Sequence, residues 1–270
     1  MQAPKILYTN ILNVTTATLS VTTAAVGYDA QNVNDWRTHT FWRGSAATAL
    51  NFTLDLGAGG DRAANCIGIC AHNLYSANYK LTVQNSTDGM TWTDRLATAQ
   101  ATSDDVLMST FAETTARYWR VALNTTAGTT ATPTIAVMAL GTSLEFPRPA
   151  QIGASPVNVS VVSKSNRSQT GILLGNIVKY HPMSLNLSFN MLPTTFFRST
   201  SGTAANYGDF WKNHGQYALP FFVSFSGDTF PEAKYLMRLA ENSEFTMPLY
   251  DSSWVQSLSL NLISCQESST

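Results

Sequence analysis

Short runs in which apolar and polar residues alternate fill the first half of the chain. The clearest is residues 50–56, Leu-Asn-Phe-Thr-Leu-Asp-Leu, where every second side chain is apolar; this pattern predicts a strand with one buried face. Residues 79–84 and 116–123 alternate in the same way, whereas 65–71 is almost continuously apolar and predicts a central strand. Residues 134–140 form the last run of this half. Turn residues separate the runs and no long helical period lies between them, so we expect an antiparallel sandwich.

A segment rich in proline and glycine, residues 141–156, separates two halves of different character and predicts a domain boundary. We place an N-terminal β-sandwich at residues 1–146 and a second β-rich sandwich or barrel at residues 147–270. Residues 206–215 predict the one short helix of the second half. The strands expected there are 157–162, two within 171–191, 218–226, 245–250 and 254–263, while 230–238 fits either a strand or a helical turn.

The composition favours a protein that acts through its surface contacts. Only 12% of the residues are charged, about half the usual share of roughly 25%, so Thr, Ser, Asn and Gln must make up most of the polar surface. Such a surface suits glycans or large protein contacts better than polyanions. The net charge of −1 and the lack of any run of Lys and Arg disfavour nucleic-acid binding.

The three cysteines do not have the spacing of a disulfide framework. Cys66 and Cys70 are four residues apart in an apolar run, which places them on one face of a strand and favours small buried core residues over metal ligands. The N-terminus has no apolar signal core, and no apolar run reaches the roughly 18 residues of a membrane span. We therefore expect synthesis in the cytoplasm, with action outside a cell only after release.

No catalytic motif emerges from the sequence. The four histidines have no metal-site spacing, and the nucleophile elbow, the phosphate loop and the dinucleotide fingerprint are all missing. A pair of carboxylates for glycoside hydrolysis can come from distant parts of a chain, so that reading stays open. Asp55, at the end of a predicted strand, fits a structural hydrogen-bonding role. We expect no enzyme activity, no cofactor and no metal site.

Five segments of the first half, taken in order, carry a family resemblance. They are Thr40-Phe-Trp-Arg43, the strand 50–57 ending in Asp-Leu-Gly, Asn65-Cys-Ile-Gly-Ile69, the stretch 83–92 with Ser-Thr-Asp-Gly-Met-Thr-Trp, and Ala116-Arg-Tyr-Trp-Arg-Val121. This set resembles the discoidin, or coagulation-factor type C, family. The resemblance covers about residues 5–145 and implies a galactose-binding-like jelly-roll sandwich. Two tryptophans of these segments, Trp92 and Trp119, are expected to pack in its core.

Members of that family bind glycans, lipids or proteins through loops at one end of the sandwich, which here correspond to residues 28–43 and 72–78. A sugar is held by an aromatic face together with planar hydrogen-bonding side chains. The resemblance thus implies a set of candidate ligand-binding residues, namely Tyr28, Asp35, Trp36, Arg37, His39, His72, Asn73 and Tyr75. Trp36 and Tyr75 also fit a role in covering the end of the sandwich. The resemblance leaves open a calcium ion at Asp29 or Asp35.

The second half resembles tail-tube and distal-tail proteins of tailed bacteriophages, through Tyr207-Gly-Asp-Phe-Trp211 and the run 214–222 between alternating strands. This resemblance implies a homo-oligomeric ring around a tail channel. The hypothesis for the whole chain is a structural protein of a virion, located in the tail tip or baseplate. Its expected partners are other tail proteins and, through the sandwich, a host-surface glycan. The alternative is a free lectin-like glycan-binding module or an accessory domain of a carbohydrate-active enzyme.

Overall fold

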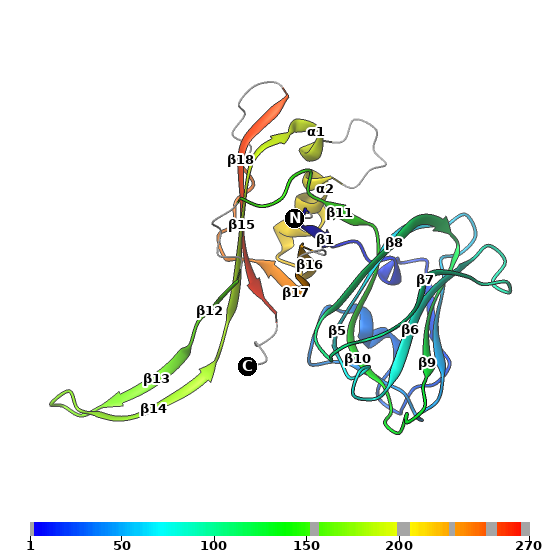
Figure 1. The fold of residues 1–270 in the computed structure, drawn as a ribbon, viewed down its shortest axis with the longest axis horizontal. Coiled ribbons are helices and arrows are strands. Elements are labelled where there is room, and N and C mark those ends of the chain that lie inside the picture. Colours follow the sequence, from blue (N-terminus) through cyan, green and yellow to red (C-terminus); the bar gives the residue numbers. More distant parts are fainter. Residues whose placement is uncertain (1–2, 152–156, 199–205, 227–229, 247–252, 266–270) are drawn as a thin grey trace.

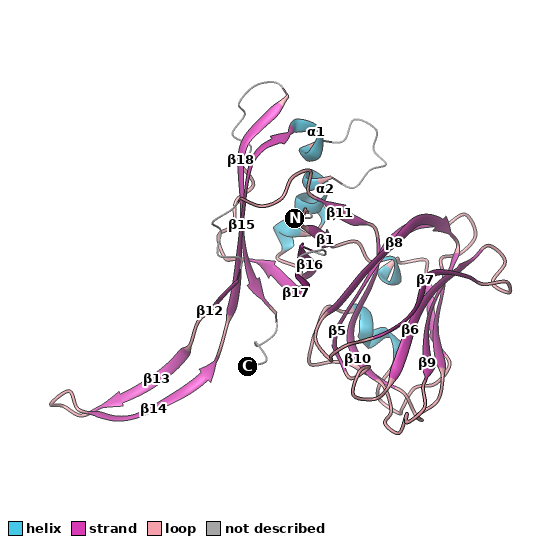
Figure 2. Cartoon of the chain, viewed as in Figure 1, coloured by secondary structure: helices cyan, strands magenta, loops and turns pink. Residues whose placement is uncertain are grey.

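A computed structural model describes residues 3–151, 157–198, 206–226, 230–246 and 253–265. The fold class is mainly β, as predicted, and every strand pairing in these ranges is antiparallel. The chain forms two units that lie side by side, and a long two-stranded hairpin projects from the second unit away from the first (Figures 1 and 2).

The first unit is the predicted sandwich of two facing sheets. In the five-stranded sheet the order is β2 (Thr18–Val21), β4 (Leu50–Asp55), β9 (Tyr118–Thr125), β6 (Tyr79–Ser86) and β7 (Thr93–Gln100). In the four-stranded sheet it is β3 (Trp42–Arg43), β10 (Thr134–Gly141), β5 (Arg62–His72) and β8 (Leu107–Ala116). Trp42 and Trp119 are fully buried among Leu, Ile and Val side chains in the core of this unit. The alternation of apolar residues therefore indicated the correct buried face.

The second unit is built on a seven-stranded sheet. Its order is β11 (Ser143–Glu145), β1 (Lys5–Leu7), β16 (Phe221–Ser226), β17 (Phe230–Leu239), β18 (Trp254–Ser264), β15 (Met183–Pro193) and β12 (Val157–Val159). The short helices α1 (Thr194–Phe197) and α2 (Tyr207–Asn213) pack on it. Asn206 caps α2 by accepting a hydrogen bond from the N–H of Asp209. The predicted helix and the predicted strands 218–226 and 254–263 are confirmed, residues 230–239 form a strand, and part of the expected strand 245–250 lies outside the described residues.

The first strand of the chain does not belong to the sandwich. Strand β1 pairs with β16 on one side and with β11 on the other, so the seven-stranded sheet contains residues from both sides of the sandwich sequence. Lys5 and Glu145 form an ion pair of 3.2 Å across β1 and β11. The domain division at residue 146 thus differs from the structure, because the run 5–7 satisfies its backbone hydrogen bonds and buries its apolar side chains in the second unit.

The two units meet through the outer face of the four-stranded sheet. Cys66 and Cys70 point outward from β5 into a cluster with Leu7 and Phe222 of the seven-stranded sheet. The ring of Phe222 lies directly over Gly68, where a Cβ atom would come within 2.6 Å of the ring carbons. Both thiols are buried, as predicted, and burial raises the pKa of Cys66 to about 12. We call this apolar contact between the units the joint.

The projecting hairpin consists of β13 (Val162–Arg167) and β14 (Leu173–Tyr180), and we call residues 162–180 the arm. It continues the β12–β15 pair of the seven-stranded sheet and extends to the far left of Figure 1, at the opposite end of the molecule from the sandwich. Every residue of β14 is exposed, although the strand contains Leu, Ile, Val and Tyr. The sequence predicted a strand in the region of β14 but neither β13 nor the exposure of the arm.

Candidate ligand-binding site

Four connections gather at one end of the sandwich. They are the segments 22–49, 73–78, 101–106 and 126–133, which link strands whose ends are paired with one another, as in Tyr79 with Thr125 and Ile135 with His72. We call this region the loop end. All eight candidate ligand-binding residues lie on two of these connections or at the strand terminus beside them. The structure therefore brings together the loops that the sequence had singled out.

The turn after residue 34 separates a structural carboxylate from an aromatic ring. Asp35 accepts hydrogen bonds from the N–H of Arg37 at 2.9 Å and from the hydroxyl of Thr40 at 2.6 Å, so both of its oxygens hold the turn. Trp36 has a left-handed backbone with φ of 63°, and its ring turns toward the second unit. It lies 5.6 Å from the ring of His214 and 6.1 Å from that of Phe222. Trp36 therefore helps to close the joint.

His72 and Asn73 also serve the architecture of the loops. His72 is buried and its Nδ1 accepts a hydrogen bond from the N–H of Leu74 at 3.2 Å. Burial lowers the pKa of His72 below its usual range, while the nearby Asp104 acts in the opposite direction. Asn73 donates to the carbonyl of Thr132 at 3.0 Å and accepts from the N–H of Thr134 at 2.7 Å. Both polar groups of Asn73 thus fasten the connection 126–133.

Of the four remaining candidates, three expose their side chains to solvent and one is half-buried. Arg37 and His39 are exposed, and Tyr75 is 49% exposed. Tyr28 is half-buried, with its ring 4.9 Å from that of Phe41. A guanidinium, an imidazole and a phenol provide planar hydrogen-bonding groups and an aromatic surface, which are the features that a saccharide requires. Of these four remaining candidates, Arg37, His39 and Tyr75 are accordingly the accessible ones.

Asp104 organises the loop end, although no motif in the sequence marks it. Its Oδ1 accepts the N–H groups of Tyr75 at 2.8 Å and Ser76 at 3.2 Å, which ties the segment 101–106 to the segment 73–78. Side chains that accept two successive backbone N–H groups occur in many turns, yet here donor and acceptor are far apart in sequence. The sequence spacing of these residues therefore did not predict the contact.

Trp92 lies outside the core, so the prediction that it packs between the sheets is wrong. It is half-buried and its ring is covered by the guanidinium of Arg120, 4.2 Å from the ring centroid. Arg120 donates to Gln84 at 2.6 Å, and Gln84 in turn donates to Asp94 at 2.6 Å. The residue follows a turn in which Gly89 takes a left-handed φ of 74°, and this turn directs the ring onto the polar outer face. Trp119 is buried as predicted.

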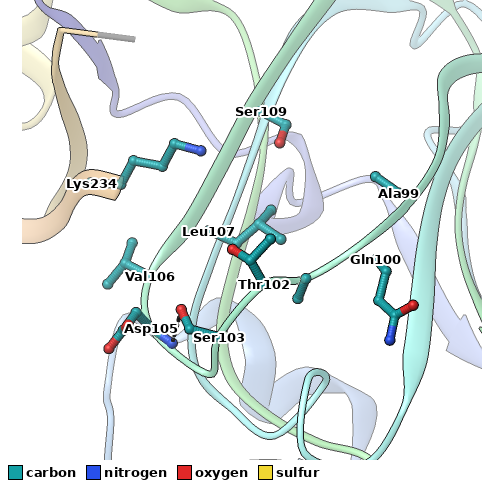
Figure 3. A pocket seen from close by; sticks show the side chains of 10 residues that line it. Ala99, Gln100, Thr102, Ser103, Asp105, Val106, Leu107, Ser109 and Lys234 are labelled. Atoms are coloured by element: carbon teal, nitrogen blue, oxygen red, sulfur yellow. Dashed lines mark hydrogen bonds between the residues drawn. The ribbon is translucent and has the colours of Figure 1, made fainter. Parts of the chain in front are cut away.

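A hollow of about 430 Å³ lies at the loop end, between the β7–β8 connection and the second unit (Figure 3). Gln100, Thr102 and Asp105 line it from the sandwich, and Lys234 reaches it from β17. Leu107 adds an apolar surface. None of the described residues that line the hollow is aromatic, so it lacks the flat apolar surface on which a sugar ring stacks. The sequence alone did not single out these residues.

The acidic residues and potential metal ligands of the described ranges bear on the question of catalysis. Asp55 accepts two hydrogen bonds from Arg117, at 2.7 and 3.0 Å, and these bonds lower the pKa of Asp55. This pairing confirms the structural role expected for Asp55. In the ranges that the structure describes, no three His, Cys, Asp or Glu side chains gather in a way that could hold a metal ion. In the same ranges, no helix is both long and apolar enough to span a membrane.

Comparison with known proteins reaches about half of the chain. No family model and no curated protein matches it. Among solved structures, the carbohydrate-binding module (CBM32) of AlyQ in complex with 4,5-unsaturated mannuronic acid matches 46% of this chain and 92% of its own, with 18% identity and a TM-score of 0.38. A chitosan-binding module from a chitosanase/glucanase of Paenibacillus sp. matches 49% of this chain and 98% of its own, with 18% identity and a TM-score of 0.40.

A third match is to an enzyme. A fucosidase of Ruminococcus gnavus in complex with fucose is matched over 51% of this chain and 27% of its own, with 23% identity and a TM-score of 0.41. At these identities and TM-scores, the likeness brings neither a ligand nor an activity to this chain. None of the three structures is described as a bacteriophage tail protein.

Proposed function

We propose that this chain is a non-catalytic assembly protein, in which the arm joins copies into a homo-oligomer and the sandwich presents its loop end to a saccharide. The observation that carries this proposal is the arm, which exposes large apolar side chains far from both cores. The tail tip or baseplate of a bacteriophage is the setting we propose for the assembly. The layout of the second unit, a short helix followed by an apolar strand on a β-sheet, is the only support for that setting.

The arm is unlike a hairpin that functions alone in water. Ile177 and Val178 follow one another in a regular stretch of β14, so they point to opposite faces. They are 70% and 48% exposed, respectively. An isolated two-stranded hairpin is only marginally stable, and a long apolar strand with free edges invites pairing with another chain. A partner that covers the arm would stabilise it by burying these side chains.

Assembly is tested by mass photometry of the full chain at micromolar concentration. We expect a discrete oligomer for the wild type and a monomer of 29.3 kDa for Ile177→Asp, which places a charge on the arm. Val26→Asp is the matched control, because Val26 is fully exposed on a loop of the sandwich. A wild-type chain that stays monomeric throughout would refute the assembly role. Electron cryo-microscopy of tailed particles tests the setting, and particles without this chain would refute it.

The second candidate function is a monomeric saccharide-binding module, and it is favoured by the exposed Arg37, His39 and Tyr75. Isothermal titration with mono- and oligosaccharides tests it, with Tyr75→Ala as the site variant and Met90→Ala as the control. Met90 is exposed in the turn between β6 and β7, at the opposite end of the sandwich. If Tyr75→Ala and the wild type bind every saccharide equally, the loop end is not the binding site.

A further inference from the structure

We infer that the arm of one copy docks on a particular surface of the next copy, formed by α2 and the segments packed beside it. This inference rests on the proposed assembly function and identifies its partner as a second copy of the chain. Apart from the arm and the strand leading into it, the described part of the second unit exposes only two large apolar side chains. They are Tyr217 at 65% and Leu219 at 37%.

Tyr217 and Leu219 stand on a rigid base. Between them, Ala218 has a left-handed backbone with φ of 51°, a conformation that is unfavourable outside glycine and persists only where its surroundings hold it. Gly215 precedes the pair, and a Cβ there would come within 3.0 Å of Leu239 and 3.2 Å of Trp211. The turn is therefore closely packed from below while its two apolar side chains face outward. A rigid surface of this kind loses little conformational entropy on binding.

Acidic side chains border this surface. Phe245 stacks on Trp211 with 5.7 Å between ring centroids, and Leu239 lies against Gly215, so the segment between them runs beside α2. That segment carries Glu241 and Glu244, both exposed. Arg238 is 4.0 Å from Glu241, and Lys212 and Asp209 on α2 add one charge of each sign. We call the surface of Tyr217, Leu219, Glu241 and Glu244 the corner, and its neighbourhood carries a net negative charge.

The arm has the complementary character. It contains Lys164, Arg167 and Lys179, and neither Asp nor Glu occurs between residues 157 and 183. These three leave 13 of the 16 Lys and Arg to the rest of the chain, which holds all 17 Asp and Glu and so carries a charge of −4. The arm of one copy is thus basic and apolar, whereas the rest of a second copy is acidic and presents one outward apolar surface, the corner, on its second unit. Complementary charge of this kind steers association and fixes register.

The arm cannot reach the corner of its own chain. In Figure 1 the arm runs away from α2, which lies between the seven-stranded sheet and the sandwich. Contact between them must therefore join different surfaces of two copies. Such head-to-tail contacts close into a ring or continue as a filament. The sandwich offers Val26, Tyr75 and Met90 as its exposed large apolar residues, and each of them lies on a different loop.

A mixing experiment with the full chain tests the corner separately from the proposed assembly. One variant carries Ile177→Asp on the arm, and the other carries Tyr217→Ser with Leu219→Ser on the corner. Each variant keeps one half of the contact, so we expect both to be monomeric alone and to form a 1:1 dimer when mixed. Mass photometry should then show a species of twice 29.3 kDa. Circular dichroism and thermal unfolding verify that both variants are folded.

The outcomes distinguish the two ideas. If Ile177→Asp disperses the oligomer while the corner variant assembles like the wild type, the arm does not dock on the corner, but the proposed assembly function is retained. If the wild type is monomeric, both fail. Charge reversal gives a second readout: Lys179→Glu should weaken assembly at least about tenfold, and Glu241→Lys with Glu244→Lys in the same chain should restore it. Restored assembly supports docking of the arm on the corner. If Lys179→Glu weakens assembly and the corner reversal does not restore it, docking on the corner is contradicted.

Discussion

The joint between the two units makes a sharp prediction at Gly68. Replacing this glycine by alanine adds one methyl group directly beneath the ring of Phe222, where the new Cβ would lie 2.6 Å from Cγ and Cδ2 and 2.9 Å from Cδ1. Real Cβ atoms do not approach other atoms so closely, so the ring must move. Phe222 is fully buried in the joint, which leaves it little room. Overpacking of this type costs about 1–3 kcal/mol, even though alanine is otherwise preferred to glycine within a strand.

Chemical denaturation followed by tryptophan fluorescence measures the cost, because Trp36 lies 6.1 Å from Phe222 and reports on the joint. A loss of about 2 kcal/mol corresponds to a fall of roughly 4–8 °C in the melting temperature of a chain of this size. Gly175→Ala is the control, since no atom lies within 4 Å of a Cβ at that position. It should change the stability by less than about 0.5 kcal/mol.

A double-mutant cycle isolates the clash. Phe222→Ala alone should destabilise the chain by about 3–5 kcal/mol, because it leaves a cavity in the joint. Once the ring is removed, the additional change Gly68→Ala should cost less than about 0.5 kcal/mol, because the methyl group then enters free space. A cost of Gly68→Ala that is the same with and without the ring would show that Phe222 is not the obstacle and would refute this description of the joint.

Three further predictions concern the loop end and the joint. Asn73→Ala removes the two hydrogen bonds that hold the connection 126–133, and equilibrium unfolding should show a loss of about 1–3 kcal/mol. Burial lowers the pKa of His72 and His214. Below the unfolded histidine pKa of about 6.5, the unfolded chain therefore binds more protons than the folded chain, and the free energy of unfolding should fall as the pH drops from 7 to 5. A free energy of unfolding that does not change over this range would contradict the burial of the two rings. Trp36→Ala should lower the melting temperature, because it removes a ring from the joint, and should leave saccharide affinity unchanged. Isothermal titration of the wild type and the variant checks this, and an unchanged melting temperature with weaker saccharide binding would contradict it.

Local periodicity predicted five of the nine strands of the sandwich, namely β4, β5, β6, β9 and β10. The alternation in residues 50–56 placed Leu50, Phe52 and Leu54 on one face, and all three are buried between the sheets. This success has a simple cause, because side chains of a strand alternate whatever the strand later packs against. Strands β2, β3, β7 and β8 were missed. β3 has only two residues, and most residues of β7 and β8 are small or polar and are exposed or only partly buried.

The candidate residues named from the sequence differ in how accessible the structure leaves them. Arg37, His39 and Tyr75 are accessible at the loop end, as a binding role requires. Trp36 and His72 have the residue types of a sugar site but are used in packing, because neighbours far away in sequence cover them. Asp104, which joins two loops, offered no motif at all. Residue type indicates what a side chain can do, whereas its surroundings determine whether it is available.

The sequence by itself predicted the antiparallel β class, the position of most strands along the chain and the burial of Cys66 and Cys70, because each follows from local pattern or composition. Only the tertiary structure determined which parts of the chain cover each face of a strand. It placed residues 5–7 in the second sheet, turned Trp36 into the joint, put Trp92 under Arg120 and left the apolar arm uncovered. The physical reason is that periodicity identifies residues sharing a face, while burial of that face depends on contacts between segments far apart in the chain.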